Sequence, residues 1–96
     1  MNKKYELMVV LDPDLKPEEQ EKIITKIKDG VSDAKGKITS SKDFGKKHLA
    51  YLISKKSEGF YWFFELEIPA QNAPSFRQKI QMEEKIIRYL LTTISR

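Results

Sequence analysis

A chain of 96 residues with 40% hydrophobic content can bury one two-layer core, so we expect a single folded domain over residues 1–96. The absence of cysteine excludes a disulfide scaffold and a thiolate metal site, and one histidine leaves few other metal or catalytic combinations. No run approaches the roughly 20 apolar residues of a membrane helix. Because the first residues lead straight into a strand rather than a signal peptide, we expect a cytoplasmic protein with no membrane partner.

The net charge of +4 is unevenly distributed along the chain. Residues 36–56 carry six lysines against one aspartate, whereas residues 17–35 balance acids and bases. A basic edge on a neutral body is typical of a protein that binds a polyanion, most often nucleic acid. An ordinary lysine-rich surface is the alternative.

The first predicted element is a strand over Tyr5–Leu11, which ends at the turn residues Asp12-Pro13-Asp14. Alternation places Tyr5, Leu7, Val9 and Leu11 on its core face. A helix follows from Pro17, with acidic residues at its first turn and Gly36 as its left-handed C-cap. Its apolar stripe consists of Ile23, Ile24, Ile27, Val31 and Ala34.

A β-hairpin is the next predicted unit. A weak, polar strand over residues 37–45 is expected to enter it through a kink or bulge near Gly45. The hairpin strands are predicted over Lys46–Ile53 and Phe60–Ile68, joined by a polar turn in which Gly59 supplies a positive φ. Alternation assigns Leu49, Tyr51, Ile53, Trp62, Phe64, Leu66 and Ile68 to the core, and Lys46, His48, Ala50, Leu52, Tyr61 and Phe63 to the opposite face.

A second, shorter helix is predicted after Pro69, capped by Asn72 and containing Phe76 and Ile80 on one face. Glu83-Glu84 interrupts the pattern, and a last strand follows over residues 85–94. Its core positions are predicted to be Ile87, Tyr89 and Leu91, with Arg88 and Leu90 facing the other way.

This order of elements predicts an α+β, ferredoxin-like βαββαβ fold, in which a four-stranded antiparallel sheet carries two helices on one face. The second face of the sheet then has only its own side chains to shield it, so we expect RNA, a partner protein or both to dock there or at the basic edge. The run Lys46-Lys47-His48 has two compatible interpretations, which are protection of an exposed strand edge and contact with phosphates.

Nothing in the sequence points to catalysis, a cofactor or a small-molecule substrate. There is no phosphate-binding loop, nucleophile elbow or zinc-protease motif. Glu65 and Glu67, like Glu83 and Glu84, are interpreted as solvated carboxylates, and His48 lacks an orienting carboxylate. Tyr61 and Phe63 could stack on bases, although FYWFFELEI does not match the signature of RNA-recognition modules.

Several motifs together resemble the bacterial small-subunit ribosomal protein six family. They are Lys4-Tyr5-Glu6, Asp12-Pro13-Asp14-Leu15, Gly45-Lys46-Lys47-His48-Leu49-Ala50-Tyr51, Gly59-Phe60-Tyr61 and Ile86-Ile87-Arg88-Tyr89-Leu90. The resemblance covers essentially the whole chain. Leu52 departs from it, since the family usually has proline there.

The resemblance implies a non-catalytic structural protein that binds the central domain of 16S rRNA together with small-subunit ribosomal protein eighteen. Carried over by position, the implied RNA-binding residues are Lys3, Lys4, Tyr5, Lys46, Lys47, His48 and Arg88. For the partner protein we expect Tyr61, Phe63 and Leu90 on the open face. The family mostly has arginine at the basic run, so lysine and histidine lose the bidentate fork here.

Two other functions remain open on the sequence alone. One is a regulatory module of the same fold that dimerises through its open sheet face. The other is a ferredoxin-like hydrolase such as an acyl phosphatase. It would need a phosphate-binding loop after the first strand, where the acidic Asp12-Pro13-Asp14 would repel the substrate.

Overall fold

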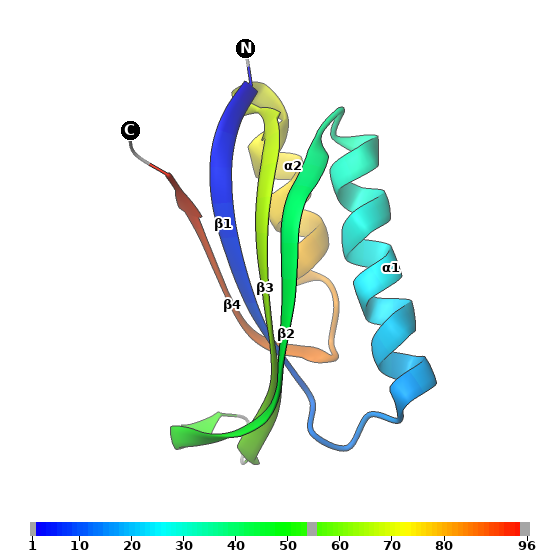
Figure 1. Cartoon of the computed structure of the whole chain (residues 1–96), viewed down its shortest axis with the longest axis vertical. Helices are drawn as coiled ribbons and strands as arrows, with labels where there is room; N and C mark the ends of the chain where they lie inside the picture. Colours follow the sequence, from blue (N-terminus) through cyan, green and yellow to red (C-terminus); the bar gives the residue numbers. More distant parts are fainter. Residues whose placement is uncertain (1, 54–55, 95–96) are drawn as a thin grey trace.

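The computed structural model describes residues 2–53 and 56–94, without the side chains of residues 49–53 and 56. Its elements follow the predicted order (Figure 1). They are β1 (Asn2–Leu11), α1 (Pro17–Asp33), β2 (Lys37–Ile53), β3 (Lys56–Pro69), a 3-10 turn (Ala70–Asn72), α2 (Ala73–Gln81) and β4 (Ile86–Thr93).

The four strands form one antiparallel sheet in the order β2-β3-β1-β4. Both helices lie on the same side of this sheet, and the other side is uncovered (Figure 1). The predicted ferredoxin-like fold is therefore confirmed. We call the uncovered side the open face. The two edge strands are β2 and β4, so the long basic strand has a free edge.

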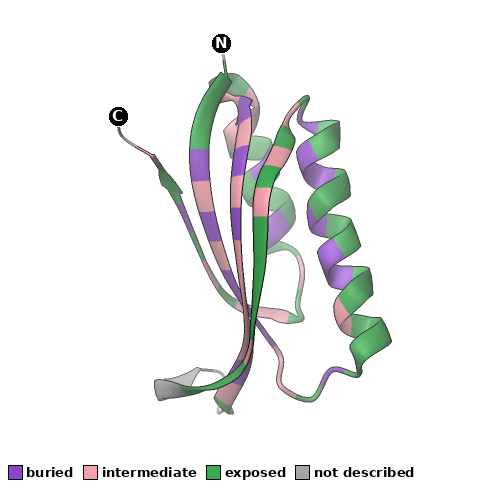
Figure 2. Cartoon of the chain, in the orientation of Figure 1, coloured by how far each residue is buried: buried purple, intermediate pink, exposed green. Residues whose placement is uncertain are grey.

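The core lies between the sheet and the helices (Figure 2). The predicted alternation in β1 is confirmed, because Leu7, Val9 and Leu11 are fully buried and Tyr5 is 7% exposed. The predicted stripe of α1 also contributes, and Phe64, Leu66 and Ile68 of β3 complete the wall. Trp62 packs at the margin of this core with its ring stacked on Phe64, the centroids 6.0 Å apart.

The ends of α1 differ from the prediction in one respect. At the start, the Glu19 carboxylate accepts a hydrogen bond from the backbone N–H of Lys16, as in a capping box. At the end, Lys35 and not Gly36 adopts the left-handed conformation, with φ of 66°. The N–H groups of Lys35 and Gly36 donate to the carbonyls of Ser32 and Val31, a Schellman motif.

Gly36 is needed for space rather than for backbone conformation. A Cβ at this position would lie 2.1 Å from Cγ2 of Ile68 and 2.3 Å from the carbonyl oxygen of Glu67. The chain leaving α1 therefore passes directly against β3, and only a residue without a side chain fits there.

Asn72 precedes α2 as predicted, but its side chain does not cap that helix. Its Nδ2 instead donates a hydrogen bond of 2.8 Å to the backbone carbonyl of Ala34. This bond satisfies a carbonyl at the end of α1 and connects the two helices. The predicted cap is therefore wrong in its partner, because the end of α1 lies within reach.

The predicted kink at Gly45 is confirmed as an irregularity in the pairing of β2 with β3 between Asp43 and Gly45. Gly45 has a φ of 75°, and its N–H donates to the Asp43 carboxylate at 2.8 Å. The extra residue reverses the alternation beyond it. Lys46 is therefore opposite Phe60 and His48 opposite Glu58, on the helix-side parity, and their predicted place on the open face is wrong.

The hairpin is longer than predicted, since β3 already begins at Lys56. Gly59 is a buried strand residue opposite Lys47 and has no positive φ, contrary to the prediction. A Cβ on Gly59 would lie 2.4 Å from Cγ1 of Val10, so this glycine permits close packing. The expected positions of Leu49, Ala50, Tyr51, Leu52 and Ile53 concern side chains outside the described residues.

A second irregularity corrects the prediction for β4. Arg88 pairs with Val10 and Ile86 with Leu11, so Ile87 is an extra residue in this strand. Ile86 takes the core position in its place, and Tyr89 and Leu91 contact the core as predicted. The sequence alternation misplaced Ile87 because a bulge shifts every position on one side of it.

Candidate nucleic-acid interface

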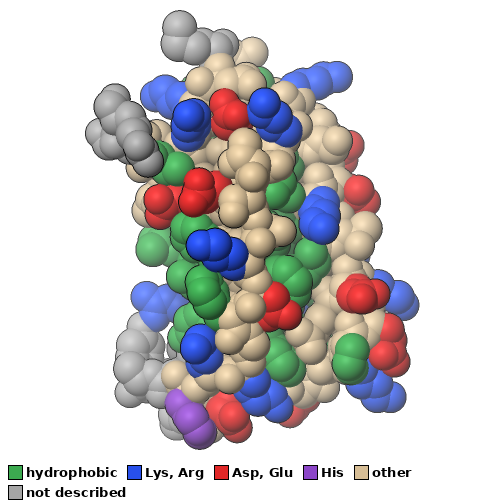
Figure 3. All heavy atoms as spheres, viewed as in Figure 1, with side chains coloured by type: hydrophobic (Ala, Val, Ile, Leu, Met, Phe, Trp, Pro, Cys, Tyr) green, Lys and Arg blue, Asp and Glu red, His purple; other side chains and the backbone are tan. Residues whose placement is uncertain are grey.

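The predicted basic run lies on the edge strand β2, in the half of that strand nearest to the start of β3. We call this part of the molecule the hairpin end. Lys46, Lys47 and His48 are all exposed. The Lys46 ammonium lies 5.2 Å from the centre of the Phe60 ring, which orients this side chain. Figure 3 shows the histidine (purple) at this end, with an acidic side chain (red) directly beside it and Lys or Arg side chains (blue) nearby.

Lys3 and Lys4 lie at the opposite end of the sheet. On β1, Lys4 is at the level of Glu67 in β3. Leu11 of β1 is at the level of Phe60 in β3, which is also the level of Lys46 in β2. Seven residues of extended strand separate the two levels, which corresponds to about 23 Å. The structure therefore divides the predicted RNA-binding residues between two ends of a molecule whose longest dimension is 39 Å.

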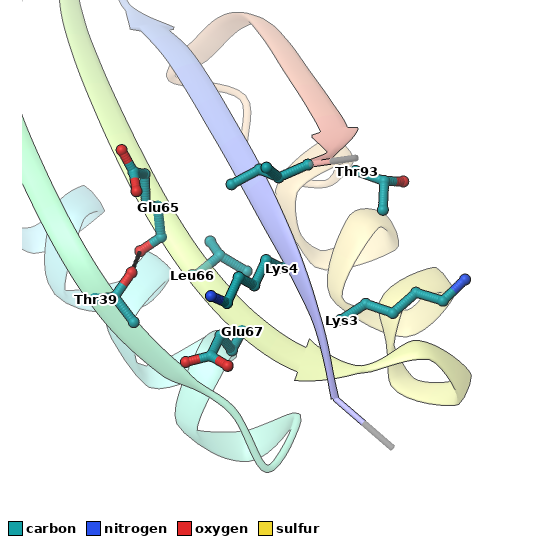
Figure 4. A pocket seen from close by; sticks show the side chains of 8 residues that line it. Lys3, Lys4, Thr39, Glu65, Leu66, Glu67 and Thr93 are labelled. Carbon is teal, nitrogen blue, oxygen red and sulfur yellow. Dashed lines mark hydrogen bonds between the residues drawn. The ribbon is translucent and has the colours of Figure 1, made fainter. Parts of the chain in front are cut away.

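The basic residues at the N-terminal end also differ in direction. Lys3 and Lys4 extend to opposite sides of β1, Lys4 on the open face (Figure 4). They line a hollow of about 620 Å³ with Thr39 and the final strand. Tyr5, which is only 7% exposed, belongs to the core and has little surface left for contact with RNA.

Arg88 lies nearer to the hairpin than to the N-terminal end. It forms one row across the sheet with Val10 of β1, Tyr61 of β3 and Gly45 of β2. Directly opposed residues share a face, so Arg88 and Tyr61 both lie on the open face. Lys47 is on the same face two residues beyond Gly45, so the hairpin half of the open face carries Arg88 on one edge strand and Lys47 on the other.

Lys42 is an exposed cation that the sequence placed in the basic segment but not at the site. It pairs with Phe63, so it also lies on the open face and on the free edge. The sequence alone does not place Lys42 on this face, because the alternation of β2 does not continue through the bulge at Gly45.

The predicted partner residues do come together. Phe63 and Leu90 are both opposite Met8, one from each side, and Tyr61 is in the next row of the same face. Leu90 is 61% exposed, and Met8, Phe63 and Tyr61 are partly exposed. Val10 is only 3% exposed, and Gly59 lies directly against its side chain. This apolar area, Met8, Tyr61, Phe63 and Leu90, we call the apolar patch.

Acidic and basic residues both occupy the rest of the open face. Glu6 and Glu65 are directly opposite each other in the row beside the apolar patch. In the row after that, Glu67 forms an ion pair of 3.6 Å with Lys37. No described residue forms a hydrogen bond or ion pair with the carboxylate of Glu6 or of Glu65. The open face is thus basic and aromatic toward the hairpin, and toward the chain termini it carries the two glutamates followed by a row of Lys4, Glu67 and Lys37.

This arrangement offers groups that are suited to binding. Within residues 2–53 and 56–94 no three His, Asp or Glu side chains are grouped as metal ligands. No described helix is long and apolar enough to cross a membrane. What the surface offers is cations and an apolar face, which bind phosphates and apolar side chains.

Comparison with known proteins gives a consistent result. The family model described as ribosomal protein S6 matches residues 4–93. The small ribosomal subunit protein bS6 of Dictyoglomus turgidum is 28% identical over 94 residues, covering 98% of this chain and 97% of the relative. That of Caldanaerobacter subterraneus is 34% identical over 87 residues, covering 91% and 92%.

The fold has a solved counterpart as well. The crystal structure of 30S ribosomal protein S6 from Thermotoga maritima superposes with a TM-score of 0.92 at 26% sequence identity. The match covers 98% of this chain and 89% of that one. The similarity therefore extends over both helices and all four strands.

Proposed function

The chain belongs to the ribosomal protein S6 family, and from this premise we propose that it binds the central domain of 16S rRNA together with small-subunit ribosomal protein eighteen. As a member of this family it is a structural component of the small ribosomal subunit and not an enzyme. Its place is accordingly on the ribosome in the cytoplasm.

The proposed RNA-binding surface is the hairpin end, with Lys46, Lys47 and His48 on β2 and Arg88 on β4. The observation that carries this proposal is that the hairpin end presents exposed cations on an edge strand, beyond which no described strand is paired. Lysines bind phosphates as point charges, so their contribution to affinity is mainly electrostatic. Lys3 and Lys4 would form a second, separate contact at the other end, and Tyr5 would support it from the core.

The proposed surface for protein eighteen is the apolar patch, including the predicted residues Tyr61, Phe63 and Leu90. An uncovered sheet face with a leucine that is 61% exposed favours a protein partner there. The apolar patch and the hairpin-end cations are different residues on neighbouring parts of the surface, so RNA and protein eighteen can be bound at the same time.

A binding experiment with purified components tests this function. The protein is titrated onto a fragment of the 16S central domain over a salt series, with and without protein eighteen. With about four phosphates neutralised, log affinity should fall with log salt at a slope of roughly −3 to −4. We expect protein eighteen to raise the affinity. Affinity without salt dependence, or without any response to protein eighteen, would contradict the proposal.

A further inference from the structure

The open face contains a pair of like charges that the fold itself does not explain. Glu6 on β1 and Glu65 on β3 are opposed in neighbouring central strands. Cross-strand partners have Cβ atoms about 5 Å apart, and like charges at this distance destabilise the sheet. One row away, Lys4 and Lys37 lie on either side of Glu67, and Lys37 forms an ion pair with it. Opposite charges are therefore available on this face, but among the described residues none forms an ion pair with Glu6 or Glu65.

The pair is placed next to the apolar patch. The row of Glu6 and Glu65 and the row of Met8 and Phe63 are successive on the same face, about 7 Å apart. Both glutamates are partly exposed, so their carboxylates are accessible from the open face. A molecule that covers the apolar patch therefore also covers the two carboxylates.

The charge decides which class of molecule fits. Burying two unpaired carboxylates under an apolar or anionic partner is unfavourable, because their hydration would be lost without compensation. RNA phosphates would be repelled. A guanidinium group has five donors in a planar fork and can bond to both carboxylates at once.

We infer that Glu6 and Glu65 form the receptor for an arginine side chain of the protein partner, whose neighbouring apolar side chain occupies the apolar patch. This inference rests on the proposed function and deepens it. The partner segment would carry the two side chains about 7 Å apart, as at alternate residues of an extended strand or at a spacing of three to four residues in a helix. The two glutamates would then direct protein, and not RNA, to the rows of the open face between the apolar patch and Lys4.

The test uses the full chain with Glu6→Gln and Glu65→Gln combined, and protein eighteen as the probe. The matched control is Glu18→Gln with Glu21→Gln, which removes two exposed carboxylates from α1. Loss of charged hydrogen bonds should weaken the affinity for protein eighteen by roughly 10- to 100-fold. In the control we expect at most a small change in the affinity for protein eighteen. For RNA, measured without protein eighteen, we expect the Glu6/Glu65 variant to bind at least as tightly as the unsubstituted chain.

Three results would overturn the inference. The first is an unchanged affinity of the double variant for protein eighteen while the unsubstituted chain binds it, which would leave the proposed function intact. The second is a lower thermal midpoint of the double variant, because it would show that the carboxylates bond within the chain. The third is dimerisation of the free protein by light scattering that the double variant abolishes, which would assign the face to a second copy. If the unsubstituted chain does not bind protein eighteen at all, it is the proposed function that fails.

Discussion

Replacing Lys46 and Lys47 together by glutamine separates the two interpretations of the basic run, which are phosphate contact and protection of the strand edge. The substitutions lower the net charge of +4 by two and keep both side chains polar. Lys46 is in contact with Phe60, and an exposed cation–π contact contributes about 0.5–1 kcal/mol to stability. Lys47 is opposite a glycine and adds little. We therefore expect the free energy of unfolding to fall by no more than about 1 kcal/mol.

The effect on RNA binding should be much larger. If each lysine neutralises one phosphate, the slope of log affinity against log salt changes from about −3.6 to about −1.8. Between 50 and 200 mM salt, the parent would then lose roughly 150-fold in affinity and the variant only about 12-fold. Filter binding or fluorescence anisotropy on the 16S fragment measures both slopes.

The control for charge alone is Lys22→Gln with Lys28→Gln, which removes two exposed lysines from α1. We expect this variant to keep nearly the whole salt slope of the parent. Equal slopes for the two double variants would refute a specific site at the hairpin end. Self-association of the Lys46/Lys47 variant with an unchanged slope would show that these lysines only protect the edge of β2.

Three further predictions follow from the packing. Gly36→Ala should destabilise the fold by about 1–3 kcal/mol in urea, because the new methyl group would meet Ile68 and the carbonyl of Glu67; an unchanged midpoint would contradict this contact. Asn72→Ala should cost about 1 kcal/mol by removing the bond to Ala34, and unfolding of this variant at the same denaturant concentration as the parent would show that the bond is dispensable. Leu90→Ser should change the stability of the free protein by less than about 0.5 kcal/mol but weaken binding to protein eighteen; equal binding would remove the apolar patch from the interface.

Most of the fold could be predicted because periodicity reports burial directly. Leu7 and Val9 alternate with Glu6 and Met8, and the stripe of α1 repeats at helical spacing, so the layers and the order of elements follow from the sequence. Packing of both helices on one face follows from right-handed crossovers.

The errors lie where one residue changes the alternation or where two distant segments meet. The bulge at Ile87 shifts the residues on one side of it, and Lys46 and His48 lie on the helix side although the apolar residues that follow them predict the opposite face. The roles of Gly36 and Gly59 depend on Ile68 and Val10 from other strands, which no local pattern reveals. The strand register, which the local pattern does not determine, separates Lys4 from Lys46 and brings Glu6 opposite Glu65.

We propose that RNA binds at the hairpin end and not over the outer side of α1. Directed hydroxyl-radical cleavage tests this, and because the chain has no cysteine, single cysteines can be introduced cleanly. An iron chelate is attached to Lys47→Cys or to Lys22→Cys on α1, and each protein is assembled with the 16S central domain and protein eighteen. We predict strand cleavage from position 47 and little or none from position 22. Cleavage from position 22 without cleavage from position 47 would contradict the account.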